Sequence, residues 1–192
     1  LPTCLDFFLA FYGILWIGAV TVPLYPPLRL DQADDFIARQ DGILENCGAR
    51  VLISLPQLAP MAQLLRRRSG LQTITSVKAL SHSGVAALGP PGQLALIQYT
   101  SGSTGRPKGV ALSHENLLAN TWAFGKEFGM VSGEIMVSWL PLYHDMGLIG
   151  TTLGSLSHGL GLVVMGPERF LARPVHWLQA ITRYRGTLSA AP

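Results

Sequence analysis

The residues best suited to chemistry lie in a glycine- and hydroxyl-rich stretch near the middle of the chain. Residues 99–109 read YTSGSTGRPKG. Glycines let the backbone approach a phosphate closely, successive backbone N–H groups form an anion-binding concavity, and a lysine adds a point charge. Hydroxyl groups can donate hydrogen bonds to phosphate oxygens. The stretch therefore predicts a polyphosphate-binding loop with the ligand residues Thr100, Ser101, Gly102, Ser103, Thr104, Gly105 and Lys108.

Two other interpretations of this stretch are open. A flexible surface linker is also rich in Gly and Ser, but strand-like apolar runs at 94–97 and 110–112 flank the stretch on both sides. The Walker phosphate loop has the pattern G-x-x-x-x-G-K-S/T. Here Lys108 precedes Gly109 and no hydroxyl follows the lysine, so the pattern disfavours a P-loop NTPase.

A second candidate site is the segment 141–147, which reads PLYHDMG and follows the apolar run 136–139. In open α/β sheets, ligands bind beyond the carboxyl ends of strands. We therefore predict that His144 is a catalytic substrate-site residue that donates a hydrogen bond to a carboxylate. The alternative is that His144 caps the next helix. We interpret Asp145 as a helix cap rather than a base, because negative charge suits a helix N-terminus and adjacent side chains rarely face each other.

The elements that must position these residues alternate between helix and strand. Helices are expected in the apolar run after residue 7, at 31–47, 57–68 and 113–128, from about residue 145, and from 174 to 186. Strands are expected at 19–22, 50–54, 71–75, 94–97, 110–112, 136–139 and 161–165, with a linker at 81–92. This alternation predicts an α/β fold with layered, mostly parallel sheets and flanking helices.

Several apolar residues are expected in the core. The apolar face of the helix at 113–128 consists of Leu117, Leu118, Thr121, Trp122 and Phe128, and Trp139 and Trp177 also lie in apolar patterns. The residues Met146, Gly147, Leu148, Ile149, Gly150, Gly154 and Gly159 fit either a narrow apolar channel or ordinary helix packing. A channel could select alkyl chain length, because each buried CH₂ is worth about 0.8 kcal/mol.

Composition excludes several classes of protein. The 192 residues are 48% hydrophobic and 13% charged, which argues against disorder. The net charge of +3 is mild, and the one dense basic run, 66–68, suits the end of a helix, so nucleic acid is not an expected partner. Cys4 and Cys47 are too few for a disulfide framework, and a reduced, cytoplasmic protein is expected. His82, His114, His158 and His176 lack the spacing of metal ligands, so no metal site is predicted.

Residues 7–28 contain no charged side chain and raise the question of a membrane span. Gly13, Gly18, Pro23, Pro26 and Pro27 interrupt the run, and no basic flank precedes it. A buried helix followed by a buried strand explains it better, so neither a transmembrane segment nor a signal peptide is predicted.

Three segments carry a resemblance to a known family. YTSGSTGRPKGV at 99–110 resembles the phosphate-loop signature of the adenylate-forming enzymes, the superfamily of acyl-CoA synthetases, luciferases and nonribosomal-peptide adenylation domains. SWLPLYHDMGLIG at 138–150 resembles the following core motif in the form typical of fatty acyl-AMP ligases and long-chain acyl-CoA synthetases. FLAFYGILWIGAVTVPLYPP at 8–27 is similar to the early helix and strand of the same group.

The resemblance implies that residues 1–192 are part of the large N-terminal adenylation domain, without the small C-terminal lid domain. It implies ATP and Mg²⁺ as cofactors, with the loop around Lys108 cradling the ATP phosphates and His144 helping to seat the acyl substrate and adenylate. The family's later motifs, which contact adenine, magnesium and ribose and supply the lid lysine, do not occur here. We therefore expect the isolated piece to be inactive.

The function that the resemblance implies is ATP-dependent activation of a fatty acid to acyl-AMP, with release of pyrophosphate. The form of the second motif suggests an acyl carrier protein as acceptor, and coenzyme A is the alternative. A non-catalytic nucleotide-binding fragment is a further alternative. Acyl chain length, fusion to a polyketide or peptide synthase and oligomeric state do not follow from these residues.

Overall fold

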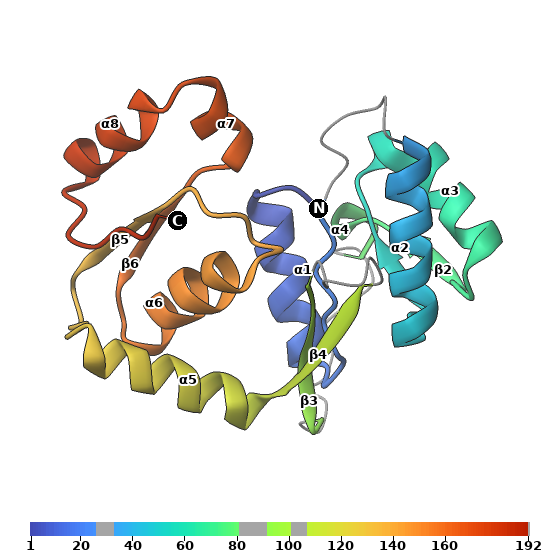
Figure 1. Cartoon of the computed structure of the whole chain (residues 1–192), viewed down its shortest axis with the longest axis horizontal. Coiled ribbons are helices and arrows are strands. Elements are labelled where there is room, and N and C mark those ends of the chain that lie inside the picture. Colours follow the sequence, from blue (N-terminus) through green and yellow to red (C-terminus); the bar gives the residue numbers. More distant parts are fainter. Residues whose placement is uncertain (26–32, 81–91, 101–106, 192) are drawn as a thin grey trace. The chain divides into compact units, whose positions relative to one another are not determined.

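The structure is a computed structural model that describes the chain except for residues 26–32, 81–91, 101–106 and 192. The chain divides into two compact units. The first consists of Thr3–Leu112 with Leu1, and the second of Ser113–Pro192 with Pro2. Each unit is described by itself below, with the elements labelled as in Figure 1.

The first unit begins with helix α1 (Leu5–Trp16), which buries Phe7 and Phe11 with their rings stacked 5.9 Å apart. The strand expected at 19–22 is only a single parallel bridge between Thr21 and Leu96. Thr21 donates to the Ala95 carbonyl from both its backbone N and its Oγ1, each at 2.9 Å. The bridge cannot grow into a longer ladder because Pro23 has no N–H to donate.

The middle of the first unit alternates helix and strand as predicted. It contains α2 (Ala33–Cys47), β1 (Val51–Ile53), the 3₁₀ turn η2 (Pro56–Leu58), α3 (Ala59–Arg68), β2 (Thr73–Thr75) and α4 (Val77–Leu80). β1 and β2 pair in parallel. The core between these elements is formed by Ile37, Leu44, Leu65 and Leu71. The short α4 was not predicted from the sequence.

Strands β3 (Leu94–Thr100) and β4 (Lys108–Ser113) are neighbours in a two-stranded sheet. Ala95 and Leu96 are fully buried at the start of β3, whereas both Thr100 and Lys108 are exposed. The candidate phosphate loop is the connection between these two strands.

The second unit begins with α5 (His114–Glu127), whose N-terminus is capped by Ser113. The Ser113 side chain accepts a hydrogen bond from the backbone N of Asn116, and the Asn116 side chain accepts one from the backbone N of Ser113. Such reciprocal capping satisfies two backbone donors that the helix cannot use itself. Ser113 is thus the N-cap of the helix expected at 113–128.

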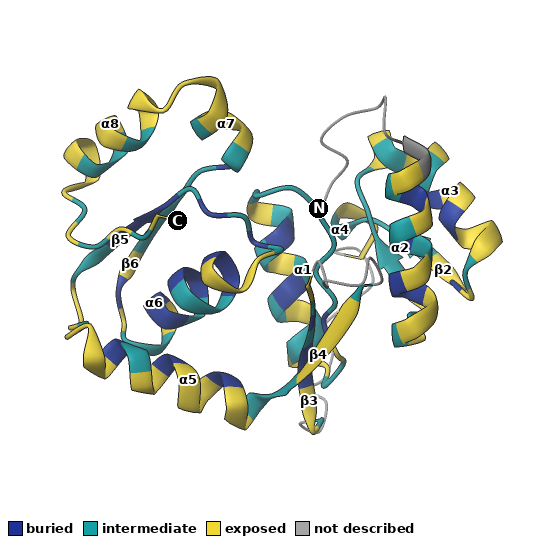
Figure 2. Ribbon diagram, in the orientation of Figure 1, coloured by how far each residue is buried: buried dark blue, intermediate teal, exposed yellow. Residues whose placement is uncertain are grey.

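The predicted apolar face of α5 was partly wrong. Leu117, Thr121 and Gly125 are buried, and these residues follow one another at every fourth position. Leu118, Trp122 and Phe128 are instead exposed, with exposed fractions of 55%, 61% and 73%. The buried and exposed faces alternate along the helix in Figure 2.

The centre of the second unit is a parallel pair of strands, β5 (Ile135–Ser138) and β6 (Gly161–Val164). Leu188 adds an isolated parallel bridge to Met136 of β5. The π-helix η3 (Met146–Leu153) and α6 (Gly154–Ser157) connect β5 to β6. The α/β fold with parallel strand pairs is therefore confirmed.

The second unit ends with α7 (Pro167–Ala172), which was not predicted, and α8 (Val175–Tyr184). α8 stops two residues earlier than expected, and its left-handed capping residue is Arg185 with φ 52°. Gly186 has a different role, because a Cβ there would lie 2.5 Å from Cγ2 of Val137. Trp139 and Trp177 are half-buried and form an aromatic cluster with Phe170.

Cys4 and Cys47 are both free thiols. Among the described residues, no helix has both the length and the apolar character needed to cross a bilayer.

Candidate active site

The two residues that flank the undescribed part of the predicted phosphate loop on its strands are Thr100 and Lys108. Thr100 is the last residue of β3 and Lys108 is the first of β4. Both are exposed. The other predicted ligand residues, Ser101, Gly102, Ser103, Thr104 and Gly105, lie outside the described residues. The hydroxyl-bearing Thr100 is thus the residue at which the chain leaves β3 for the loop, and Lys108 is the residue at which the chain enters β4.

The second predicted site follows β5 in the other unit. β5 ends at Ser138, whose Oγ accepts hydrogen bonds from the Leu140 backbone N at 3.2 Å and from Thr151 Oγ1 at 3.3 Å. The chain then turns back, and the backbone N of His144 donates to the Pro141 carbonyl at 3.1 Å. This turn presents His144 and Asp145 at the surface, where their side chains are 63% and 64% exposed.

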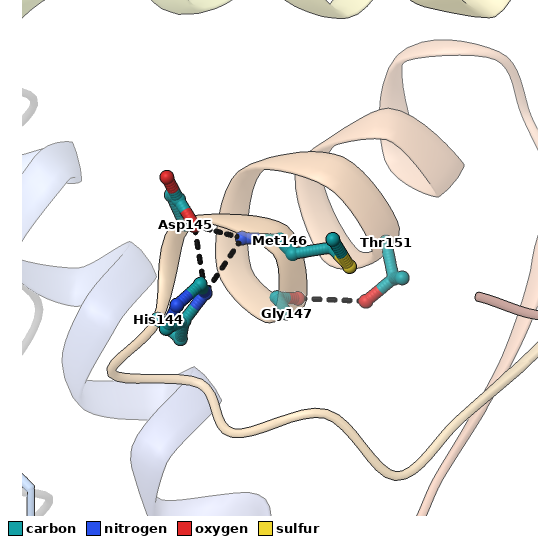
Figure 3. Close-up of polar contacts among 5 residues, drawn as sticks. All are labelled: His144, Asp145, Met146, Gly147 and Thr151. Carbon is teal, nitrogen blue, oxygen red and sulfur yellow. Dashed lines mark hydrogen bonds and ion pairs between the residues drawn. The ribbon is translucent and has the colours of Figure 1, made fainter. Parts of the chain in front are cut away.

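The His144 and Asp145 side chains contact each other directly. His144 Nδ1 lies 2.7 Å from Asp145 Oδ1, and the same oxygen accepts a hydrogen bond from the Met146 backbone N at 2.7 Å. Figure 3 shows these contacts at the start of η3. The predicted role of Asp145 as a helix cap is confirmed. The expectation that these adjacent side chains would not face each other was wrong, because the capping geometry points the carboxylate back toward the imidazole.

Nδ1 of His144 has two close neighbours. It lies 2.7 Å from Asp145 Oδ1, and it accepts a hydrogen bond at 3.3 Å from the Met146 backbone N, which also donates to Asp145 Oδ1 at 2.7 Å. When the ring is protonated, Nδ1–H can instead pair with the Asp145 carboxylate. Nε2 remains for a ligand. It is an acceptor when the ring is neutral and a donor when the ring is the imidazolium.

The π-helix that follows is fitted closely to the turn that carries His144. A Cβ on Gly147 would lie 2.1 Å from the Pro141 carbonyl oxygen, so only glycine is tolerated there. The Gly147 carbonyl accepts hydrogen bonds from Thr151 Oγ1 at 2.7 Å and from Thr152 Oγ1 at 3.0 Å. Single π-turns inside helices are frequent at functional sites. The sequence predicted a helix from about residue 145 but not this wider geometry.

The small residues of this segment pack against neighbouring helices. Leu148 is fully buried, and a Cβ on Gly154 would lie 2.7 Å from Cζ of Phe124 in α5. At these two positions and at Gly147, the structure supports helix packing rather than a channel wall. Met146 is 42% exposed at the start of η3.

The other histidines that the structure describes do not gather into a site. His158 is half-buried beside Gly125, and its Nδ1 lies 3.1 Å from the Gly154 carbonyl oxygen. Within the described ranges, no three His, Cys, Asp or Glu side chains lie close enough together to hold a metal ion. His82 lies outside those ranges.

Comparison with known proteins gives a consistent result. A medium-chain fatty acid–acyl-carrier-protein ligase of Moorena producens is 36% identical over 203 residues, covering 100% of this chain and 33% of the ligase. A chain solved in work on fatty acyl-adenylate ligases from E. coli and L. pneumophila matches with a TM-score of 0.91 at 33% identity, covering 100% of this chain and 35% of that one. A fatty acyl-adenylate ligase from L. pneumophila in complex with acyl adenylate and pyrophosphate matches with a TM-score of 0.86 at 32% identity, covering 100% of this chain and 33% of that one.

The chain therefore spans about a third of the length of these relatives. The family model for AMP-binding enzymes matches residues 1–192, which is the whole of this chain. The chain belongs to the AMP-binding enzyme family.

Proposed function

We propose that the complete protein activates a fatty acid with ATP, forming acyl-AMP and releasing pyrophosphate. The observation that carries this proposal is the exposed Lys108 at the start of β4, directly after a glycine- and hydroxyl-rich loop, in a chain of the AMP-binding enzyme family. The names of its relatives, a fatty acid–carrier-protein ligase and fatty acyl-adenylate ligases, support the same reaction.

The reaction is a displacement at phosphorus. A carboxylate oxygen of the fatty acid forms a bond to the α-phosphorus of ATP, and the bond from that phosphorus to the oxygen bridging the β-phosphate breaks. The electron pair leaves with pyrophosphate. Lys108 offsets the negative charge that grows on this leaving group. The hydroxyls of Thr100, Ser101, Ser103 and Thr104 hold the β- and γ-phosphate oxygens in line with the attack.

His144 is assigned to the acyl end of the substrate. With Nδ1 donating to Asp145, the imidazolium form offers Nε2–H to a carboxylate or acyl-adenylate oxygen. Such a charge-assisted hydrogen bond is roughly twice as strong as a neutral one. In this role His144 binds and orients the substrate and does not need to transfer a proton.

ATP fits the side chains at the loop ends, where an ammonium group and a hydroxyl group are both exposed. We propose that Mg²⁺ enters the site already bound to the triphosphate of ATP. Protein sites for Mg²⁺ commonly use only one or two carboxylates besides substrate phosphates and water. Thr100 and Lys108 contribute to holding the same phosphates from the protein side.

The acceptor of the acyl group is proposed to be the thiol of an acyl carrier protein, as the name of the Moorena producens relative suggests. Coenzyme A is the alternative thiol. We also propose that residues 1–192 are part of a larger adenylation domain, since the relatives are about three times as long. A cytoplasmic location fits the two free cysteines.

The complete protein tests this proposal. Fatty acids of graded length are added with ATP and Mg²⁺, exchange of labelled pyrophosphate into ATP is followed, and acyl-AMP is detected by mass spectrometry. Exchange that depends on a fatty acid is expected. ATP hydrolysis that needs no carboxylate would instead indicate a nucleotidase and contradict the proposal.

A second assay assigns the acceptor. The complete protein is given ATP, the preferred fatty acid and equal concentrations of holo acyl carrier protein and coenzyme A. Acylation of the carrier protein is expected. If acyl-CoA is the main product, the acceptor is coenzyme A and not the carrier protein, and the proposed adenylation step still holds.

A further inference from the structure

Three elements of the first unit meet at the base of the phosphate loop. The Tyr99 hydroxyl, near the end of β3, donates a hydrogen bond to Oδ1 of Asn46 on α2. The Tyr99 ring also lies against the backbone of Gly109, the second residue of β4. One tyrosine thus connects the last turn of a helix with both strands that flank the loop.

The contact with Gly109 is close. A Cβ at this position would lie 2.9 Å from Cζ of Tyr99, 3.1 Å from its hydroxyl oxygen and 2.9 Å from Cγ2 of Ile97. Gly109 does not have a positive φ. Glycine is therefore needed here for the close approach of the strand to the ring, and not for an unusual backbone conformation.

The hydroxyl of Tyr99 stays protonated at neutral pH. Burial raises the pKa of Tyr99 above its usual range, and the nearby Cys47 thiol raises this pKa further. The phenol is therefore available as a donor to Asn46 under physiological conditions, and this hydrogen bond holds the ring in one orientation.

Lys108 depends on its backbone for its position. In the described part of the chain, no carboxylate lies within ion-pair distance of the Lys108 ammonium group. Its side chain is exposed, and lysine is a flexible point charge. The backbone at 108–109 therefore sets the position from which the Lys108 side chain extends. Gly109 of this backbone lies directly against the Tyr99 ring.

We propose that Tyr99 is a positioning residue for Lys108. Its ring, oriented by the hydrogen bond to Asn46, holds the start of β4 so that the Lys108 ammonium group reaches the departing pyrophosphate. This inference rests on the proposed adenylation function. It assigns Tyr99 no contact with substrate.

Two substitutions test the hydrogen bond from opposite sides in the complete protein. Tyr99→Phe keeps the ring and removes the donor, and Asn46→Ala removes the acceptor. Both should lower the kcat of acyl-AMP formation by the same factor, about two- to fivefold, which corresponds to one ordinary hydrogen bond. The double variant should lose no more than either single variant. Additive losses would contradict a shared role.

Gly109→Ala tests the close approach. The added methyl group would clash with the Tyr99 ring and with Cγ2 of Ile97, so the ring or the strand must shift. A misplacement of about 1 Å can cost up to about 100-fold in rate. We expect kcat to fall at least about tenfold, while the KM for the fatty acid stays within about twofold of the wild-type value. The matched control is Gly42→Ala, since a Cβ at Gly42 of α2 meets nothing within 4 Å. This control should keep wild-type kinetics.

The decisive comparison uses a Lys108→Ala background, with acyl-AMP measured in single turnovers. If Tyr99 acts through Lys108, neither Tyr99→Phe nor Gly109→Ala should lower the residual rate further. A merely structural role would lower the rate by the same factor with or without the lysine, and this result would overturn the inference. Thermal unfolding of each variant is measured alongside, and the Tyr99→Phe series carries the test if Gly109→Ala does not fold.

The outcomes separate this inference from the function on which it rests. A wild-type protein that forms no acyl-AMP with any fatty acid contradicts the proposed function. An active wild type whose Tyr99→Phe and Gly109→Ala variants keep its kcat contradicts only the role of Tyr99.

Discussion

At the scale of single residues, the two proposed catalytic side chains are held in different ways. Lys108 has no ion-pair partner within the described residues and depends on the backbone beneath it. His144 is instead held by its sequence neighbours, because its Nδ1 lies 2.7 Å from Asp145 Oδ1, and the backbone N of Met146 donates to both atoms. Substitution of Asp145 therefore tests the orientation of the histidine without removing it.

Asp145→Asn should weaken the use of the fatty acid and leave ATP binding unchanged. The amide has nearly the shape of the carboxylate, but it loses the charge that favours Nδ1–H of His144. An ion pair between exposed side chains is worth about 0.2–1 kcal/mol, so kcat/KM for the fatty acid should fall by up to about fivefold. Steady-state kinetics in the complete protein measure both substrates. Glu115→Gln, on the exposed first turn of α5, is the matched control. An unchanged kcat/KM for Asp145→Asn would show that the contact between Asp145 and His144 is not used.

Cys47 should react slowly with alkylating agents in the folded protein. Burial raises the pKa of its thiol, so less of the reactive thiolate is present at a given pH. At pH 8, iodoacetamide should modify Cys47 more slowly than the same residue in urea, and the difference should narrow as the pH rises toward the raised pKa. Mass spectrometry of the Cys47 peptide measures both rates. Equal rates at pH 8 would contradict the burial of this thiol.

At the scale of elements, the turn after β5 and the π-helix η3 form one fitted unit. Gly147 lies against the Pro141 carbonyl, while the backbone N of His144 donates to that same carbonyl oxygen. The position of the histidine is thereby coupled to the packing of the helix. A change in the helix that leaves every polar side chain in place should still disturb the site.

Gly147→Ala should lower both stability and activity. A Cβ would lie 2.1 Å from a backbone oxygen that cannot easily move, and overpacking of this kind typically costs about 1–3 kcal/mol. Chemical denaturation and kcat/KM for the fatty acid measure the two effects. Gly150→Ala is the control in the same helix, since its Cβ would meet only Cγ of Met146 at 3.9 Å. Equal behaviour of the two variants would contradict the close fit.

The elements also show what the sequence can predict. α2, α5 and β5 were predicted because helix caps, apolar periodicity and strand length are local properties. The single bridge at Thr21, the exposure of Trp122 and the width of η3 were not predicted, since they depend on which surfaces meet. For the site, residue types identified Lys108 and His144 as candidates. The contacts of Tyr99 with Asn46 and Gly109 were not predicted, because they join positions that are far apart in sequence or on different strands.

At the scale of the whole molecule, the chain has the fold of about a third of a larger relative. It matches a fatty acyl-adenylate ligase chain along its full length with a TM-score of 0.91, and it covers 35% of that chain. The loop end at Lys108 lies in one compact unit and His144 lies in the other. The proposed reaction therefore belongs to the complete protein, and we expect residues 1–192 alone to give no fatty-acid-dependent pyrophosphate exchange.

The most direct measurement is the rate of acyl-AMP formation in the complete protein with and without the Lys108 ammonium group. Lys108→Ala should lower kcat by about 10²–10³, the usual effect of removing one contact that strengthens in the transition state. Lys126→Ala, an exposed lysine in the last turn of α5, should leave the rate unchanged. If the Lys108→Ala protein forms acyl-AMP at the wild-type rate, the glycine-rich loop does not serve the departing pyrophosphate and the account is wrong.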